Sequence, residues 1–174
     1  MTRRTHIILI LFLAVIFTSC KNEESKNPLP VPVNPETLKI PAQGGRKLRG
    51  QVLYMPVYSN IPHLKKQDYS LSAFLAIHNT DLTYRIKITK VDYFDNDGNL
   101  IKNFISSDQQ IHPLATKIFL IPKEDQSGAG ANFLVEWIAE QPVNEPLIES
   151  IMKDLSGNKG ISFLSQGRII REMK

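Results

Sequence analysis

Most of the chain after residue 49 alternates apolar and polar residues, which is the pattern of strands with one buried face. In residues 84–94, Ile86 and Ile88 alternate with Lys87 and Thr89. Two further stretches show longer apolar faces, made of Leu71, Ala73, Leu75 and Ile77 in residues 69–80, and of Phe133, Val135, Trp137 and Ala139 in residues 131–142. Strands are therefore the main expected element.

Three more strands are expected, over residues 50–61, 112–122 and 160–170. Pro56 marks an edge or a bulge in the first of them. Asp97-Gly98, between two apolar runs, predicts a hairpin turn.

Residues 146–155 follow a different spacing, with apolar side chains at positions i, i+1, i+4, i+5 and i+8. This predicts a short helix with Asn144 as its cap and Pro146 in its first turn. An edge strand is the alternative, because the flanking segments read as strands. About six or seven short strands separated by turns predict a mainly β fold, an immunoglobulin-like antiparallel β-sandwich, with one possible short helix near 145–155. We expect this single domain to span residues 49–174.

The N-terminus is apolar without alternation. Arg3 and Arg4 precede an unbroken apolar run over residues 7–17, which is the layout of a secretory signal. Eleven residues form roughly 16 Å of helix, whereas the hydrocarbon core of a membrane is about 30 Å thick. A transmembrane helix is therefore excluded for this run.

The residues Phe17-Thr18-Ser19-Cys20 resemble the lipobox of bacterial lipoproteins, although Phe17 replaces the commoner Leu. The resemblance implies that residues 1–19 are a cleaved signal peptide and that Cys20 carries a diacylglyceryl group on its thiol and an acyl group on its new amino terminus. Two or three acyl chains give stable attachment to a membrane. An ordinary signal peptide with a chance cysteine is the alternative. Cys20 is the only cysteine, so no internal disulfide forms.

Residues 20–48 form the predicted tether, in which Pro28, Pro30, Pro32, Pro35 and Pro41 disfavour helices and central strands. A coil of about 28 residues spans about 30 Å. The alternative is an arm packed on the domain. The start of the tether, Cys-Lys-Asn-Glu-Glu, is similar to the signal that sends some Bacteroidota lipoproteins to the cell surface. With no Asp directly after Cys20, the outer membrane is the expected location.

Charge adds little to this picture. The chain has 21 Lys and Arg against 17 Asp and Glu, and removal of residues 1–19 takes Arg3 and Arg4 and leaves 19 against 17. No cluster of basic residues interleaved with aromatic ones is present, so nucleic acid is not an expected partner.

Six ordered motifs resemble one bacterial family, the domain of unknown function 3124 family. The resemblance implies an exported bacterial domain, often a lipoprotein, with no assigned activity and no catalytic residues to carry over. His78 stands where Arg is expected and Phe94 where Tyr is usual. The motifs are LYMPVYSNI (53–61), LAIHNTD (75–81), VDYFDNDGNLI (91–101), GAGANFLVEW (128–137), EPLIESIM (145–152) and GISFLSQGRII (160–170).

Metal sites are weakly supported. Asp92, Asp95 and Asp97 gather hard oxygens of the kind that calcium prefers, but Gly98 comes too early for an EF-hand loop. The favoured interpretation is a turn whose Asp and Asn side chains bond their own backbone. His63, His78 and His112 show no spacing typical of zinc. No metal or cofactor is expected, and His78 is expected to cap a strand end.

Catalytic motifs are not found. Ser127-Gly128-Ala129-Gly130 lacks the order of a nucleophile elbow, and its glycines do not precede a helix as a phosphate-binding loop requires. We therefore expect a non-catalytic module that binds another envelope protein through loops or an edge strand. The alternatives are a small-ligand, glycan or calcium module, and an enzyme of unrecognised type. Trp137 is an aromatic binding platform if exposed, with Asn132 nearby, but the alternation favours a core position.

Overall fold

The structure of the chain, a computed structural model, describes residues 47–63, 67–155 and 160–173. The chain divides into two units, residues 1–37 and 38–174, and all described residues lie in the second unit. The predicted signal peptide, Cys20 and nearly all of the tether lie outside the described residues. The first strand begins at Lys47, two residues before the predicted start of the domain.

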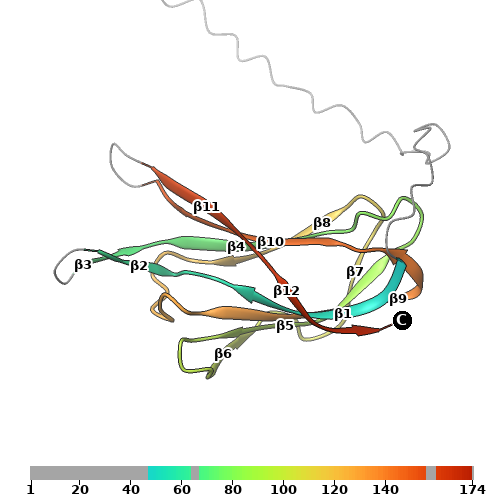
Figure 1. Cartoon of the computed structure of the whole chain (residues 1–174), viewed down its shortest axis with the longest axis horizontal. Coiled ribbons are helices and arrows are strands. Elements are labelled where there is room, and N and C mark those ends of the chain that lie inside the picture. The colour runs from blue at the N-terminus through green and yellow to red at the C-terminus, as the bar shows by residue number, and fades with distance from the viewer. Residues whose placement is uncertain (1–46, 64–66, 156–159, 174) are drawn as a thin grey trace, which may run out of the picture. The chain divides into compact units, whose positions relative to one another are not determined.

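The described residues form twelve strands in antiparallel sheets (Figure 1). The larger sheet has the order β12 (Arg168–Met173), β1 (Lys47–Pro56), β9 (Asn132–Asn144), β5 (Ile86–Phe94), β6 (Leu100–Asn103), and β7 (Gln109–Ile111) also pairs with β5. The smaller sheet has the order β11 (Ile161–Gln166), β10 (Leu147–Asp154), β4 (Ser72–His78), β8 (Thr116–Ile121). β2 (Asn60–His63) and β3 (Gln67–Ser70) form a separate hairpin. In the described part of the chain, no helix has the length and apolar character needed to cross a membrane.

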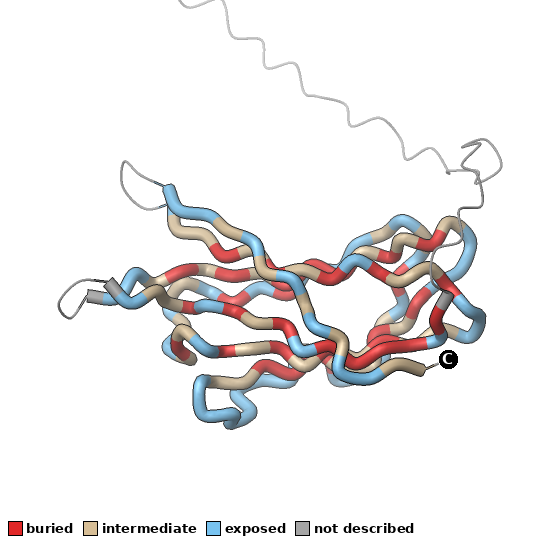
Figure 2. Tube along the Cα trace, viewed as in Figure 1, coloured by how far each residue is buried: buried red, intermediate tan, exposed pale blue. Residues whose placement is uncertain are grey.

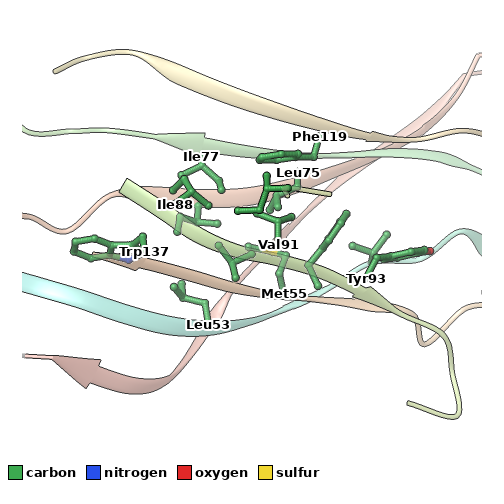
Figure 3. Close-up of a cluster of buried hydrophobic side chains, with 14 of the residues drawn as sticks. Leu53, Met55, Leu75, Ile77, Ile88, Val91, Tyr93, Phe119 and Trp137 are labelled. Carbon is green, nitrogen blue, oxygen red and sulfur yellow. The ribbon is translucent and has the colours of Figure 1, made fainter. Parts of the chain in front are cut away.

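The two sheets pack face to face, and buried residues line the space between them (Figure 2). Leu75, Ile77 and Phe119 point inward from the smaller sheet. The larger sheet contributes the facing side chains, among them Leu53, Met55, Ile88, Val91, Tyr93 and Trp137 (Figure 3). This arrangement confirms the expected mainly β fold and the β-sandwich.

The predicted apolar faces of the strands are largely confirmed. Leu71, Ala73, Leu75 and Ile77 are all completely buried, as are Phe133, Val135 and Trp137. In β5 the pairing with β9 shifts between Ile88 and Lys90. Because of this shift, the next buried residue after Ile88 is Val91, three positions later, and not the residue two positions later. Ala139 is only partly buried, because β9 leaves its regular pairing with β1 after Ile138.

The predicted helix near 145–155 is wrong, because these residues form strand β10, Leu147–Asp154. A spacing of four residues also fits a strand, since four is even and side chains four apart lie on the same face. Ile148 and Met152 point into the core, while Ile151 lies on the opposite face. β10 pairs with β4 on one side and β11 on the other, so it is not an edge strand either.

The C-terminal strands change sheets at Gly167. β11 pairs in the smaller sheet and β12 in the larger one, and Figure 1 shows the chain crossing between them. A Cβ atom on Gly167 would lie 2.8 Å from the Met55 methyl carbon and 3.3 Å from Leu53 Cδ2. The interruption that the sequence shows at Gly167 is therefore a position where the backbone lies directly against core side chains and leaves no room for a Cβ atom.

Candidate functional site

A row of apolar side chains crosses the outer face of the smaller sheet. Leu164 in β11 pairs with Ile151 in β10, Ile151 with Phe74 in β4, and Phe74 with Leu120 in β8. Ile118 lies two residues before Leu120 on the same face of β8. We call these five residues the outer apolar row.

The members of this row are exposed to different extents. Ile118 is 58% exposed, Leu120 57% and Leu164 48%, whereas Phe74 and Ile151 are partly buried. Exposed apolar groups that adjoin one another mark interaction sites more often than scattered ones do. The row is therefore the strongest sign of a binding surface on the smaller sheet.

The row follows from strands that are apolar on both faces. In β8, Phe119 and Ile121 are buried in the core, while Ile118 and Leu120 alternate with them and point outward. A strand of a sandwich needs only one apolar face to pack on the opposite sheet. The outward side chains are thus not required for the core.

β8 is also a strand with a free edge. It ends the smaller sheet and pairs only with β4 among the described strands, in an unbroken register of six residue pairs. Lys117 is its one charged residue, and the four residues after it are all apolar. A regular apolar edge of this kind is a template for pairing with another chain.

The other edges of the two sheets differ from that of β8. β12 carries two arginines, and a bulge interrupts its pairing with β1. β6 has only four residues, and β11 includes two serines and a glutamine. Charges, bulges and short length are the usual means of preventing edge pairing, and they protect β12 and β6. β11 lacks them and pairs with β10 in an unbroken register, but β8 has the longer run of consecutive apolar residues. Of these edges, β8 is therefore the most apolar.

One cationic group lies beside the row, and another lies on the opposite face of β8. Lys153 Nζ lies 5.7 Å from the centre of the Phe74 ring, whereas Lys117 is exposed on the face of β8 that carries Phe119. Glu149, on the same face as Ile151, lies 3.9 Å from His78 Nε2. Acidic side chains in a ligand would therefore find a basic neighbour at Lys153 on the outer face and at Lys117 on the other face of β8.

His78 lies at the end of β4, as expected for a residue that caps a strand. Its Nδ1 shares a hydrogen bond of 2.8 Å with Thr116 Oγ1, which joins β4 to the start of β8. His112 is exposed in the turn after β7, and the side chain of His63 lies outside the described residues. Among the described residues, no three His, Cys, Asp or Glu side chains gather closely enough to hold a metal ion.

Asp95 forms the predicted turn. Its Oδ1 accepts hydrogen bonds from the backbone nitrogens of Asp97 and Asn99 at 2.9 and 2.8 Å, and its Oδ2 accepts one from Asn99 Nδ2 at 3.0 Å. The bonds from Asn99 lower the pKa of the Asp95 carboxyl. Asp97 is exposed.

Asp92 is a buried carboxylate outside this turn. Its Oδ2 lies 3.9 Å from Lys90 Nζ, and its Oδ1 has no hydrogen-bond partner in the described part of the chain. The structure thus places Asp92 and Asp95 in separate contacts.

Trp137 is a core residue, so the interpretation as an exposed binding platform is wrong and the core interpretation is confirmed. Its Nε1 donates a hydrogen bond of 3.2 Å to Oε1 of Gln51, which is also completely buried. Gln51 Nε2 in turn donates to Glu145 Oε1 at 2.7 Å. Asn132 is partly buried at the start of β9, where it pairs with Phe94.

A buried polar corner at one end of the sandwich was not predicted from the sequence. Asn79 Nδ2 donates to the carbonyl oxygens of Tyr84 and Ile111 at 2.9 and 3.2 Å. The Asp81 carboxylate accepts from the backbone nitrogen of Asn144 at 2.9 Å. The signal was present, because Asn-Thr-Asp directly after an apolar strand is typical of turns bonded by side chains.

Residues 50–170 match the family described as "Protein of unknown function (DUF3124)". The chain belongs to this family. None of the curated proteins matches the chain at a significant level. Among solved structures, the crystal structure of Thermotoga maritima 1070 is similar, with a TM-score of 0.42 and 16% sequence identity over 72% of this chain and 96% of that chain. The family match covers all the strands from β2 to β11 and thus includes the outer apolar row.

Proposed function

We propose that this family member is a lipid-anchored protein of the bacterial cell envelope, and that its β-sandwich binds an extended segment of another envelope protein. The observation that carries the proposal is the outer apolar row beside the free edge of β8. The lipobox ending at Cys20 and the proline-rich tether support export and anchoring, most favourably at the outer membrane. The proposal involves no catalytic step, no cofactor and no nucleic acid.

The binding mode is strand addition. A partner segment would pair with the free edge of β8 through backbone hydrogen bonds, and its alternate side chains would lie over Ile118 and Leu120. Full burial of an Ile or Leu side chain contributes about 1.5–3 kcal/mol. Acidic residues that alternate with these apolar ones would lie on the other face of the segment, where Lys117 is exposed on β8. The partner is therefore a protein with an exposed strand that alternates apolar and acidic residues.

The proposed lipid anchor is tested with the substitution Cys20→Ala in the full chain. The unchanged protein should take up radiolabelled fatty acid and sediment with the membranes. The variant should lose the label and leave the membrane fraction. A Cys20→Ala protein that stays lipid-labelled would contradict the anchor.

The binding half is tested by site-specific photo-cross-linking in native envelopes. A photoreactive residue in place of Lys117 should give one discrete adduct, and the adduct should disappear when Leu120→Asp is added. The matched control is the same residue in place of Leu100, which is 56% exposed on β6 of the other sheet. Equal labelling from both positions would refute the proposal. An adduct with the mass of two copies of this chain would show that β8 binds a second copy of the same protein, which would contradict a different partner protein.

A further inference from the structure

A groove opens on the larger sheet, and none of its lining residues belongs to the outer apolar row. It has a volume of about 350 Å³. This lies at the lower end of the range of about 300–1,000 Å³ found for small-ligand pockets. The groove is lined by Thr83, Tyr84, Arg85, Ile86, Lys87, Gln110, Ile138, Ala139, Glu140 and Gln141.

One wall of the groove is a large bulge in β9. Leu48 of β1 pairs with Val143, and Gly50 pairs with Ile138, so residues 139–142 of β9 stand opposite Arg49 alone. The extra residues cannot continue the ladder, and they carry Glu140 and Gln141 to the exposed surface. Bulges of this kind commonly re-aim side chains beside functional sites.

The opposite wall is the segment that leads into β5, and a buried aspartate joins the two walls. Asp81 Oδ1 accepts hydrogen bonds of 2.9 Å from the backbone nitrogens of Thr83 and Tyr84. Its Oδ2 accepts one of 2.9 Å from the backbone nitrogen of Asn144, where β9 ends. Because Asp81 is only 2% exposed, these bonds are protected from water. The groove is therefore preformed.

The groove presents two cations that keep unused donors. Arg85 Nη1 donates to Gln110 Oε1 at 3.1 Å, which uses one of the five N–H groups of the guanidinium. Lys87 Nζ lies 3.8 Å from Asp108 Oδ2, beyond hydrogen-bond distance, and its side chain is one-third exposed. Both groups can therefore bind a carboxylate of a ligand.

The remaining lining suits a sugar ring. Tyr84 is 46% exposed, and Ile138 adds an apolar surface beside it. Gln110 and Gln141 can each donate and accept hydrogen bonds, and the Glu140 carboxylate can accept them. The hydroxyl groups of a sugar need both hydrogen-bond donors and acceptors. A purely apolar ligand would leave the polar side chains of the groove without hydrogen bonds.

We propose that this groove binds an acidic sugar, such as a uronic acid residue of a polysaccharide. The sugar carboxylate would bind Arg85 and Lys87, its ring would lie against Tyr84, and its hydroxyls would bond Glu140 and the two glutamines. The site does not include β8 or the outer apolar row, so it stands or falls independently of the function proposed above.

The test is calorimetric titration of the full-length protein, purified in detergent, with an oligogalacturonate. The expected result is saturable binding that is weakened at least about tenfold by Arg85→Gln and by Tyr84→Ala. Arg168→Gln, which removes an exposed arginine from β12 outside the groove, is the matched control and should bind like the unchanged protein. Maltohexaose, a neutral oligomer, should not compete.

Three results would overturn the proposal. They are no saturable heat with oligogalacturonate, equal binding of maltohexaose, or an equal loss of affinity in Arg168→Gln. Tryptophan fluorescence checks the fold of each variant, and Lys87→Gln replaces Arg85→Gln if the latter does not fold. Leu120→Asp, which removes an apolar side chain from β8, should leave sugar binding unchanged.

Discussion

The side-chain amide of Asn96 occupies the space that a Cβ atom on Gly128 would need. Such an atom would lie 2.3 Å from Asn96 Nδ2 and 2.7 Å from its Oδ1. Asn96 also donates its backbone N–H to the Ser127 carbonyl at 3.1 Å and accepts a bond from the Gly130 nitrogen. The turn between β5 and β6 is thereby joined to the loop that precedes β9. Two of the family-like motifs, residues 91–101 and 128–137, meet at this contact.

We predict that Gly128→Ala destabilises the protein by at least about 2 kcal/mol, because the new methyl group has no space and φ is +97°. Gly98→Ala is the matched control, since φ is +81° there but no atom lies within 4 Å of the added Cβ. It should cost only about 1–2 kcal/mol, the strain of a left-handed residue. Urea unfolding followed by tryptophan fluorescence measures both. Equal losses in the two variants would show that the Asn96 contact has no effect.

We predict a loss of stability in alkali that depends on Tyr93. Burial raises the pKa of the Tyr93 hydroxyl, and the nearby Asp125 carboxylate, which accepts its hydrogen bond at 2.8 Å, adds to the rise. In the unfolded chain a tyrosine titrates at about pH 10. The contribution of Tyr93 is therefore complete below pH 10 and is lost as the pH rises from there toward the folded-state pKa, since only the unfolded chain releases the proton.

The measurement is the free energy of unfolding between pH 8 and 11 for the unchanged protein and Tyr93→Phe. The slope assigned to one tyrosine is at most about 1.4 kcal/mol per pH unit, and Tyr93→Phe should remove it. Tyr54→Phe, at an exposed tyrosine on β1, is the control and should keep the slope. If Tyr93→Phe titrates like the unchanged protein, the Tyr93 hydroxyl is not the group responsible.

We predict that Gln51→Leu costs about 1–3 kcal/mol, because it leaves the buried Trp137 Nε1 without its acceptor. Trp137→Phe should then reduce the free energy of unfolding less in the Gln51→Leu background than in the unchanged protein. In that background the indole N–H has already lost its acceptor, so its removal breaks no hydrogen bond. Urea unfolding followed by circular dichroism gives the coupling between the two positions, which should be at least about 0.5 kcal/mol. Additive losses would mean that the hydrogen bond contributes nothing to stability.

Alternation identified the core of this protein well. Burial on one side of a sheet imposes a period of two, and residues such as Leu75, Ile77, Val135 and Trp137 carry that period in the sequence itself. The Asp95 turn was equally local, because a carboxylate that bonds the next few backbone nitrogens needs no distant partner. Both features could be predicted without knowledge of the fold.

Residues 147–154 could not be assigned in the same way. Their apolar spacing fits one face of a helix, and it also fits both faces of a strand. What decides between them is the presence of β4 and β11 on either side and of a core above Ile148 and Met152. Those neighbours come from residues 72–78 and 161–166, which local pattern cannot place.

The sequence by itself determined which side chains could be buried and where the Asp95 turn falls, and it supplied the N-terminal pattern on which the proposed lipid anchor at Cys20 rests. The tertiary structure alone decided which apolar side chains stay exposed. Ile118 and Phe119 are adjacent and similar in character, yet Phe119 faces the core and Ile118 the exterior of a free edge. The structure likewise joined Asp81 to Asn144 across the groove. The physical reason is that a binding surface depends on which strands become neighbours, and strand order is a long-range property of the chain.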